Sequence, residues 1–228
     1  MSPNPQRPAD RAYAWIRDRI FAGKFEPRAH LKEQDLAMRI GVSRSPVRDA
    51  LRRLAGEGLV VAERDRGTYV AEFSRAEIDE IFQLRAALEA YGAAHAAQRM
   101  DAPALEHLES LATKMESLSK KPGADAFARF SVLNNDFHRT ILKAANSPRL
   151  ESLLEPLISI PVFLLKHYNW RPDQVDIQRS NVEHRELIEA LRVRDPVWAR
   201  TRMHAHIVSR RPRYTTGESA PAAPLDIL

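Results

Sequence analysis

Apolar residues are distributed along this chain with the spacing of helices over almost its whole length. They recur three and four positions apart, which places them on one face of an α-helix. A different pattern occurs only between residues 59 and 70, where two short β-prone runs flank a polar turn. The pattern therefore predicts a mainly α protein with one small β-hairpin in its N-terminal third.

The residues before the hairpin are predicted to form three helices. The first extends from Asp10 to Gly23. A later apolar patch ends at Gly41, and glycine suits the tight turn between two helices because it readily adopts a positive φ. The next helix is predicted to begin near Arg44, with Ser43 or Ser45 as its cap. Its buried stripe is formed by Val47, Ala50, Leu51 and Leu54.

This third helix has one apolar face and one basic, hydrogen-bonding face. Gly58 is expected to end it, and the hairpin follows, with strands at Leu59–Ala62 and Thr68–Val70 and with Arg64 and Arg66 at its tip. Serines and arginines in the first turns of a helix can reach phosphates and guanine edges in a major groove. The alternative is that these arginines are ordinary solvent-exposed charges. The combination of the tight turn, the helix cap, the buried stripe and the hairpin favours a DNA-binding unit.

Residues 31–70 resemble the winged helix-turn-helix of GntR-family transcriptional regulators. The matching motifs are Leu31-x-Glu33-x-x-Leu36-Ala37, Gly41-Val42-Ser43-Arg44-Ser45-Pro46-Val47-Arg48-Asp49-Ala50-Leu51 and Glu57-Gly58-Leu59-Val60. One departure is Arg28, where the family commonly has glycine. The resemblance implies DNA contacts from Gln34, Ser43, Arg44, Ser45, Arg48, Arg64, Arg66 and Gly67.

The rest of the chain is predicted to be a bundle of six helices. A capping box, Ser74-x-x-Glu77, opens a helix that continues to Arg99, with Ile78, Ile81, Phe82, Leu88 and Tyr91 on its apolar side. The other helices are expected at Ala102–Ser119, Ala124–Ala145, Ser147–Tyr168 (interrupted at Pro156 and Pro161), Pro172–Val193 and Asp195–Arg213.

Three histidines fall on the apolar stripes of three different helices of this bundle. His138 lies four residues after Asn134 on the same stripe, His184 lies on that of a second helix, and His206 is favoured over His204 as the inward residue of the last helix. Each histidine alone is commonly a hydrogen-bonded core residue. Three buried together are costly unless they share a partner, and a divalent metal is such a partner.

Residues 74–213 resemble the FCD ligand-binding domain of the FadR-type branch, and six helices match its shorter, VanR-like subgroup. The motifs are Arg85-x-x-Leu88-Glu89, Phe137-His138-x-x-Ile141, Ala145-Asn146-Ser147-Pro148-x-Leu150, Glu183-His184-x-x-Leu187 and Asp195 to His206. Many members bind a metal through three histidines and an aspartate. The resemblance implies one divalent metal per chain, zinc first and nickel or manganese as alternatives, held by Asn134, His138, His184 and His206. Asn134 replaces the aspartate and removes one negative charge, which should lower metal affinity.

Arg85 also lies on an inward stripe and has two interpretations. It can form an ordinary pair with Glu89 four residues later, or it can anchor the carboxylate of an effector that also contacts Asn134, His138, His184 and His206. Asp136 is only two residues from His138 and therefore lies on a different face of the helix, so it is a poor substitute ligand.

Composition narrows the class of protein. The 228 residues include no cysteine, which excludes disulfide scaffolds and thiolate sites. Of the net charge of +5, +3 falls on residues 10–72, which favours a nucleic-acid partner for the N-terminal part. No apolar run reaches the roughly 20 residues of a membrane span, so we expect a cytoplasmic protein without a membrane partner.

These patterns predict a non-enzymatic regulator with four segments. Residues 1–9 and 215–228 are expected to be disordered, residues 10–73 to form the winged helix-turn-helix, and residues 74–214 to form an antiparallel helical bundle that binds an organic-acid effector and dimerises. The homodimer is expected to bind a palindromic double-stranded operator, more commonly as a repressor. Two alternatives remain open: a histidine-metal hydrolase fused to a DNA-binding domain, and a bundle that serves only for dimerisation.

Overall fold

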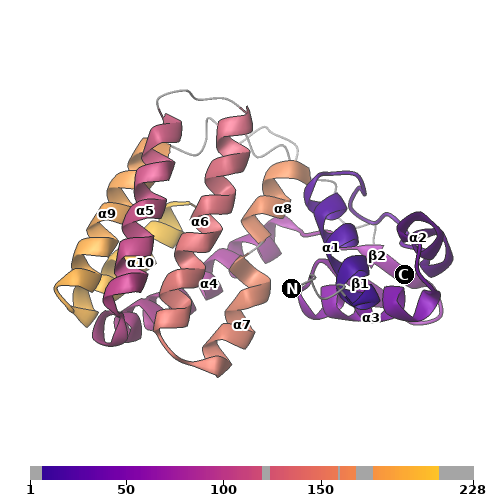
Figure 1. Ribbon diagram of the computed structural model, residues 1–228, viewed down its shortest axis with the longest axis horizontal. Helices are drawn as coiled ribbons and strands as arrows, with labels where there is room; N and C mark the ends of the chain where they lie inside the picture. The colour runs from indigo at the N-terminus through magenta and orange to yellow at the C-terminus, as the bar shows by residue number, and fades with distance from the viewer. Residues whose placement is uncertain (1–6, 120–123, 159, 168–176, 211–228) are drawn as a thin grey trace, which may run out of the picture. The chain divides into compact units, whose positions relative to one another are not determined.

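The computed structural model describes residues 7–119, 124–158, 160–167 and 177–210, and they are mostly helical (Figure 1). The chain divides into two compact units at Phe73 and Ser74. The first holds three helices and the only sheet of the described residues, and the second is all-helical. The predicted fold class, a winged helix-turn-helix followed by a helical bundle, is confirmed. The predicted disordered tail, residues 215–228, lies outside the described residues, as do residues 1–6.

The first unit is built on α3 (Arg44–Gly56), which packs against α1 (Pro8–Phe21), α2 (Glu33–Ile40) and strand β1 (Val60–Glu63). β1 pairs antiparallel with β2 (Gly67–Val70). The core side chains of the first unit are all buried, and those on its helices recur with the helical spacing that the sequence predicts. They are Ile16, Ile20, Leu36, Val47, Leu51, Leu54, Leu59 and Val70.

The helix boundaries of this unit differ slightly from the prediction. α1 begins at Pro8, so its first turn includes two residues that were expected to be disordered, and proline is tolerated there because the first N–H groups of a helix have no intrahelical partner. α3 ends at Gly56 rather than Gly58. Gly58 has φ +68°, and the hydrogen bond from the N–H of Leu59 to the carbonyl of Leu54 closes the helix end.

The turn of the hairpin depends on a glycine. Gly67 pairs with Glu63 at the end of the ladder and has φ +111°. A Cβ at this position would lie 2.4 Å from Nε2 of His30, whose ring stacks on Tyr69 with centroids 4.7 Å apart. Both the backbone angle and the neighbouring ring therefore exclude a side chain at residue 67.

Replacing Gly67 with alanine should lower the free energy of unfolding by about 1–3 kcal/mol, since alanine is strained at this φ and meets His30. Gly56→Ala is the matched control. Gly56 is the last residue of α3 and has open space where its Cβ would be, so alanine should leave the stability unchanged or raise it by up to about 1 kcal/mol. Urea unfolding of both variants measures the difference, and equal stabilities would contradict this account of the turn.

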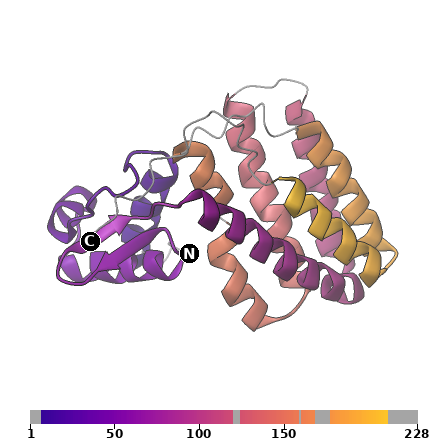
Figure 2. The ribbon, with the colours of Figure 1, turned by 180° about the vertical axis from the view of Figure 1, so that it is seen from behind.

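The second unit is organised around α4 (Arg75–Arg99), which lies against α6 (Ala124–Ala144), α7 (Pro148–Ile158), α9 (Ile177–Arg192) and α10 (Pro196–Ser209). α5 (Ala102–Ser119) lies between α6 and α9, as both views of the ribbon show (Figure 2). The predicted capping box is present, because the side chains of Ser74 and Glu77 each accept a hydrogen bond from the other's backbone N–H.

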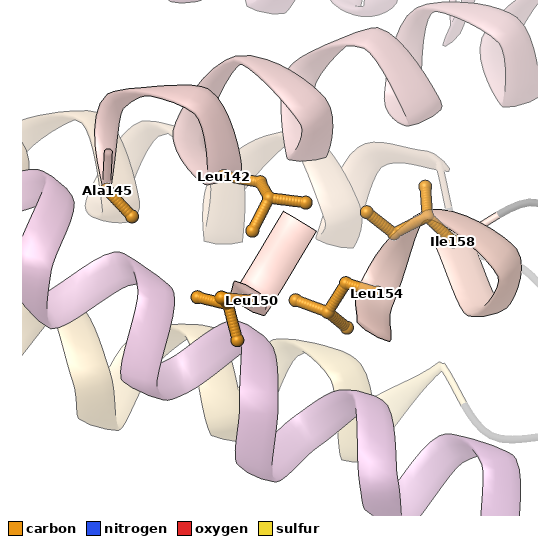
Figure 3. Packing of buried hydrophobic residues seen from close by; sticks show 5 residues of the cluster. All are labelled: Leu142, Ala145, Leu150, Leu154 and Ile158. Carbon is orange, nitrogen blue, oxygen red and sulfur yellow. The ribbon is translucent and has the colours of Figure 1, made fainter. Parts of the chain in front are cut away.

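The predicted interrupted helix from Ser147 to Tyr168 corresponds to α7 and α8 (Ile160–His167), and residue 159 between them and Tyr168 lie outside the described residues. Pro156 lies inside the last turn of α7 rather than interrupting it, and the helix lacks the one hydrogen bond that a backbone N–H at this position would donate. Buried residues of α6, of the turn after it and of α7 form an apolar cluster in this region (Figure 3): Leu142, Ala145, Leu150, Leu154 and Ile158. The predicted start of the next helix, Pro172, lies outside the described residues.

The buried face of α4 differs from the predicted one. Tyr91 was expected on the apolar side, but it is 47% exposed and its ring lies 4.4 Å from that of His95. The helix packs against α10 and α7, and its buried positions are largely occupied by small residues: Ala86, Ala90, Gly92, Ala93, Ala96 and Ala97. Arg85 and Glu89 are buried on the same helix. Within the part of the chain that the structure describes, no helix is long and apolar enough to cross a membrane.

Candidate functional site

The first candidate site is the exposed face at the start of α3. Ser43, Arg44, Ser45 and Arg48 are all exposed there, while the stripe beginning with Val47 is buried. Ser43 occupies the cap position through its backbone, but neither it nor Ser45 provides a side-chain capping bond. Their hydroxyls therefore do not serve the helix end as predicted.

A groove of about 560 Å³ connects this face to α2 and the hairpin. Its lining includes Gln34 from α2, Arg44 and Arg48 from α3, and Gly67 from the start of β2. The structure thus places four of the predicted DNA-contacting residues around one concave surface. It leaves Arg64 and Arg66 exposed in the three-residue turn, where Asp65 adopts φ +60°.

Glu33, which no sequence pattern identified as a site residue, joins the two arginines of this groove. Its carboxylate accepts hydrogen bonds from Nε and Nη2 of Arg48, both at 2.8 Å, and another from Nη2 of Arg44 at 3.2 Å. The hydrogen bond to Arg48 is the main reason that the pKa of Glu33 falls to about 2. Glu33 is therefore ionised whenever the protein is folded near neutral pH.

This pairing predicts a measurable titration. In the folded protein Glu33 should titrate near pH 2 rather than near 4.5, and in Arg48→Ala its pKa should rise toward 4.5 because the bidentate partner is gone. A depressed carboxyl pKa contributes stability above about pH 4.5 that is lost as the pH falls toward 2. Carbon-detected NMR of the Glu33 carboxyl measures both values, and an unchanged pKa in the variant would show that Arg48 does not hold this carboxylate.

The second candidate site is a cluster of three buried histidines inside the bundle. His138 from α6, His184 from α9 and His206 from α10 are each at most 2% exposed. One ring nitrogen from each lies within 4.8 Å of the others. His204 is exposed, as expected. The three helices therefore direct three imidazoles to one point of the core.

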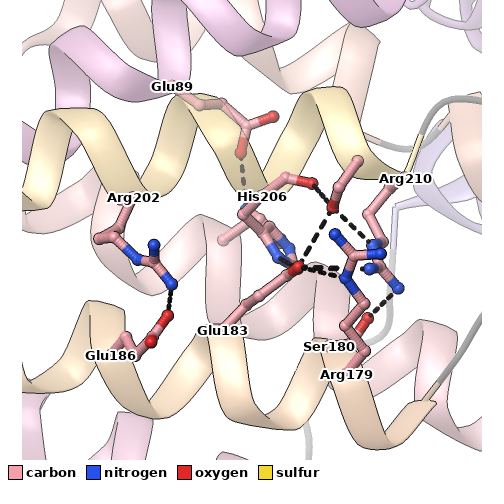
Figure 4. A network of polar contacts seen from close by, with 10 residues as sticks. Glu89, Arg179, Ser180, Glu183, Glu186, Arg202, His206 and Arg210 are labelled. Atoms are coloured by element: carbon pink, nitrogen blue, oxygen red, sulfur yellow. Dashed lines mark hydrogen bonds and ion pairs between the residues drawn. The ribbon is translucent and has the colours of Figure 1, made fainter.

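Two glutamate carboxylates lie against two of these rings. Oε2 of Glu89 lies 2.6 Å from Nδ1 of His138, and Oε2 of Glu183 lies 2.8 Å from Nδ1 of His206. A carboxylate only accepts hydrogen bonds, so in the neutral His206 ring the proton belongs on Nδ1 and the lone pair on Nε2. Glu183 is itself surrounded by Arg179, Ser209 and Arg210 (Figure 4).

Burial keeps His184 and His206 uncharged at neutral pH. It lowers the pKa of His206 to about 4, partly offset by the hydrogen bond to Glu183, and it lowers the pKa of His184 well below its ordinary value. Both ring nitrogens of His138 and both of His184 are buried without a hydrogen-bond partner among the described residues. Neutral imidazoles with unused nitrogens are the form in which histidine binds a divalent metal, so these residues fit one.

Arg85 lies beside this cluster but is already paired. Its Nε donates to Oε1 of Glu89 at 2.8 Å, and both side chains are at most 4% exposed. Burial by itself would raise the pKa of Glu89, but the charge of Arg85 and the contact with His138 lower it to about 2. The pair with Glu89 is therefore buried, not the ordinary exposed helix pair that was considered, and Glu89 links Arg85 to the histidines.

Asn134 is half-buried one turn before His138, whereas Asp136 is exposed and lies 3.3 Å from His107. Sequence reasoning missed Asn181, which is 5% exposed on α9, one turn before His184. Both polar atoms of its side chain are buried without a partner among the described residues. Its position three residues before His184 was the available signal.

Two family models match the chain. The one described as "Bacterial regulatory proteins, gntR family" matches residues 8–70, and the one described as "FCD domain" matches residues 80–209. HTH-type transcriptional regulator YdhC of Bacillus subtilis is 28% identical over 194 residues, which are 85% of either chain. The gluconate operon transcriptional repressor of the same species is 29% identical over 79% of this chain and 74% of its own. The solved structure of E. coli McbR/YncC has the same fold, with a TM-score of 0.71 at 22% identity over 89% of this chain and 94% of its own.

Proposed function

Because the chain belongs to the GntR family of bacterial regulatory proteins and carries an FCD domain, it is a DNA-binding transcriptional regulator, and we propose that it is a dimeric repressor. The family consists of regulators rather than enzymes, which argues against the alternative of a hydrolase fused to a DNA-binding domain. Relatives with repressor in their names, such as the gluconate operon repressor, support repression.

The DNA-contacting surface is the exposed face of α3 with its neighbours. Arg44 and Arg48, with the hydroxyls of Ser43 and Ser45, enter the major groove, and Gln34 contacts the duplex from the first turn of α2. Arg64, Arg66 and Gly67 of the hairpin turn contact the adjacent backbone. Two copies related by a two-fold axis read the two halves of a palindromic operator.

The histidine cluster is the effector site, and it holds one divalent metal per chain. The observation that carries this proposal is the set of buried ring nitrogens without partners, which burial makes costly unless something binds them. His138, His184 and His206 hold the metal, with Asn134 as a neutral fourth ligand, and zinc is preferred over nickel and manganese. When bound, the metal supplies a positive charge that attracts an organic-acid effector.

The chain's own residues complete the effector site. Glu183 fixes the orientation of the His206 ring, and the Glu89 carboxylate lies against His138. Asn181 offers its amide N–H groups as donors and its oxygen as an acceptor to the effector. Arg85 contributes positive charge beside the site and can grip a carboxylate with its remaining N–H groups. Effector binding changes operator affinity through a coupling free energy that is typically about 1–3 kcal/mol, or roughly 5–150-fold in affinity.

Fluorescence anisotropy tests this proposal with a labelled duplex selected from a random library by the purified protein. Two chains should bind per duplex, and the selected sequence should be palindromic. Chelation by EDTA, or members of a panel of hydroxy and dicarboxylic acids, should change the affinity within the range given above. Insensitivity to chelation and to every acid would instead support a bundle that serves only for dimerisation.

A further inference from the structure

We infer that Glu33 is a positioning residue for base recognition, an inference that rests on the proposed DNA-contacting surface. Glu33 is the first residue of α2, whereas Arg44 and Arg48 belong to α3, so one carboxylate joins both helices of the helix-turn-helix. Glu33 holds Arg48 in the orientation from which it reads a base, and it keeps both arginines from binding phosphates indiscriminately.

The geometry of the hydrogen bonds carries the first half of this inference. A guanidinium has two forks of parallel N–H groups, one formed by Nε and one Nη and the other formed by the two Nη groups. Glu33 occupies the first fork of Arg48 through Nε and Nη2. Nη1 of Arg48 has no partner among the described residues, so the second fork remains available for O6 and N7 of a guanine.

Preorganisation is the benefit of this arrangement. The Arg48 side chain is 49% exposed, and an unrestrained arginine at such a position would sample many rotamers. Two hydrogen bonds of 2.8 Å to a carboxylate on the neighbouring helix restrict it before DNA arrives. Less conformational freedom is then lost on binding, and the fork meets the base in one orientation.

Charge carries the second half of the inference. Arg44 and Arg48 together would present two positive charges to the duplex, but the ionised Glu33 between them leaves a net charge of one. Phosphate contacts dominate binding to any DNA sequence, so this carboxylate lowers affinity for random duplexes. It does not block the free fork of Arg48, so contact with a guanine is retained. Glu33 thus lowers the affinity of the protein for random DNA and raises its discrimination between base sequences.

The test compares the wild-type protein with Glu33→Gln, which keeps the size of the side chain and removes its charge. The probes are the library-selected duplex and a scrambled duplex of the same length and composition, each titrated at several salt concentrations. We expect Glu33→Gln to bind the scrambled duplex more tightly, with a steeper salt dependence by about one unit per chain. The ratio of the two affinities should fall about tenfold or more, which is roughly what one bidentate base contact supplies.

Two further variants separate charge from geometry. Asp35→Asn removes the same charge from the same turn of α2 and the same groove, but Asp35 pairs with neither Arg44 nor Arg48 in the described part of the chain. It should therefore alter both affinities alike and leave their ratio unchanged. Glu33→Asp keeps the charge but is too short for the bidentate contact, so it should lower the ratio without steepening the salt dependence.

The outcomes that contradict these expectations distinguish failure of the proposed function from failure of the role of Glu33. A wild-type protein that cannot distinguish the two duplexes would overturn the proposed function itself. A wild-type protein that distinguishes them, together with a Glu33→Gln variant that retains the full ratio, would overturn only the role of Glu33. Wild-type behaviour of Glu33→Asp would show that charge alone matters. Circular dichroism and thermal unfolding confirm that each variant is folded.

Discussion

Arg48→Ala is expected to abolish sequence-specific DNA binding and leave the fold intact. Arg48 lies on the exposed face of α3, opposite the buried stripe that packs the helix, so its side chain contributes little to the core. Losing one bidentate base contact reduces discrimination about tenfold or more, and a symmetric dimer loses two. The affinity for the selected duplex should therefore fall about 100-fold or more, to the level of a scrambled duplex.

Anisotropy titrations of both duplexes measure this loss, and Arg52→Ala is the matched control. Arg52 is one turn further along α3, its side chain is 74% exposed, and it lies 3.6 Å from Asp49. Its removal takes away the same charge but no residue of the groove, so both affinities should weaken modestly and together. Unchanged affinity of Arg48→Ala for the selected duplex would refute the assignment of Arg48.

The second large effect is the loss of the metal in His184→Ala. Wild-type protein incubated with zinc and then dialysed should retain about one ion per chain, and the variant should retain none. His184 is fully buried, and neither of its ring nitrogens has another partner within the described residues. Even changes outside the ligand shell commonly cost 10–100-fold in metal affinity, and removal of one of three imidazoles should cost more.

Elemental analysis of the untagged protein measures the metal per chain. His204→Ala is the control, because His204 lies on α10 beside the site but is exposed, and this variant should keep its metal. Removal of a buried ring also leaves a cavity, so His184→Gln, which fills more of the space, accompanies the alanine variant. Absence of metal from the wild type after incubation with zinc, nickel and manganese would reduce the histidines to hydrogen-bonding pocket residues.

The sequence was sufficient for features that depend on a single helix. Asn134 and His138 share a face because they are four residues apart, and His206 is inward because Met203 and Ile207 fix the buried side of α10. Ser74 and Glu77 form a capping box for the same local reason. Each of these predictions needs only the helical period, which the sequence displays directly.

Features that depend on contacts between elements could not be predicted in this way. Glu33 and Arg48 are fifteen residues apart on different helices, and Glu183 reaches His206 from a neighbouring helix. Periodicity indicates that a residue faces inward, but it does not identify the residue opposite. The same limit explains Tyr91, which fits the apolar pattern of α4 but is 47% exposed because the neighbouring helices pack against other positions of α4.

The small residues on the buried face of α4 have a genetic consequence. α4 and α10 form the most extensive helix pair among the described elements, and alanine permits such close approach. In a saturation mutagenesis library, Ala90, Ala93 and Ala97 should accept glycine or serine and reject leucine or phenylalanine, although none of them contacts DNA or belongs to the histidine cluster. Loss-of-function alleles would therefore accumulate along α4. Their clustering in a genetic screen would reflect the packing of α4 against α10 and not a second regulatory site.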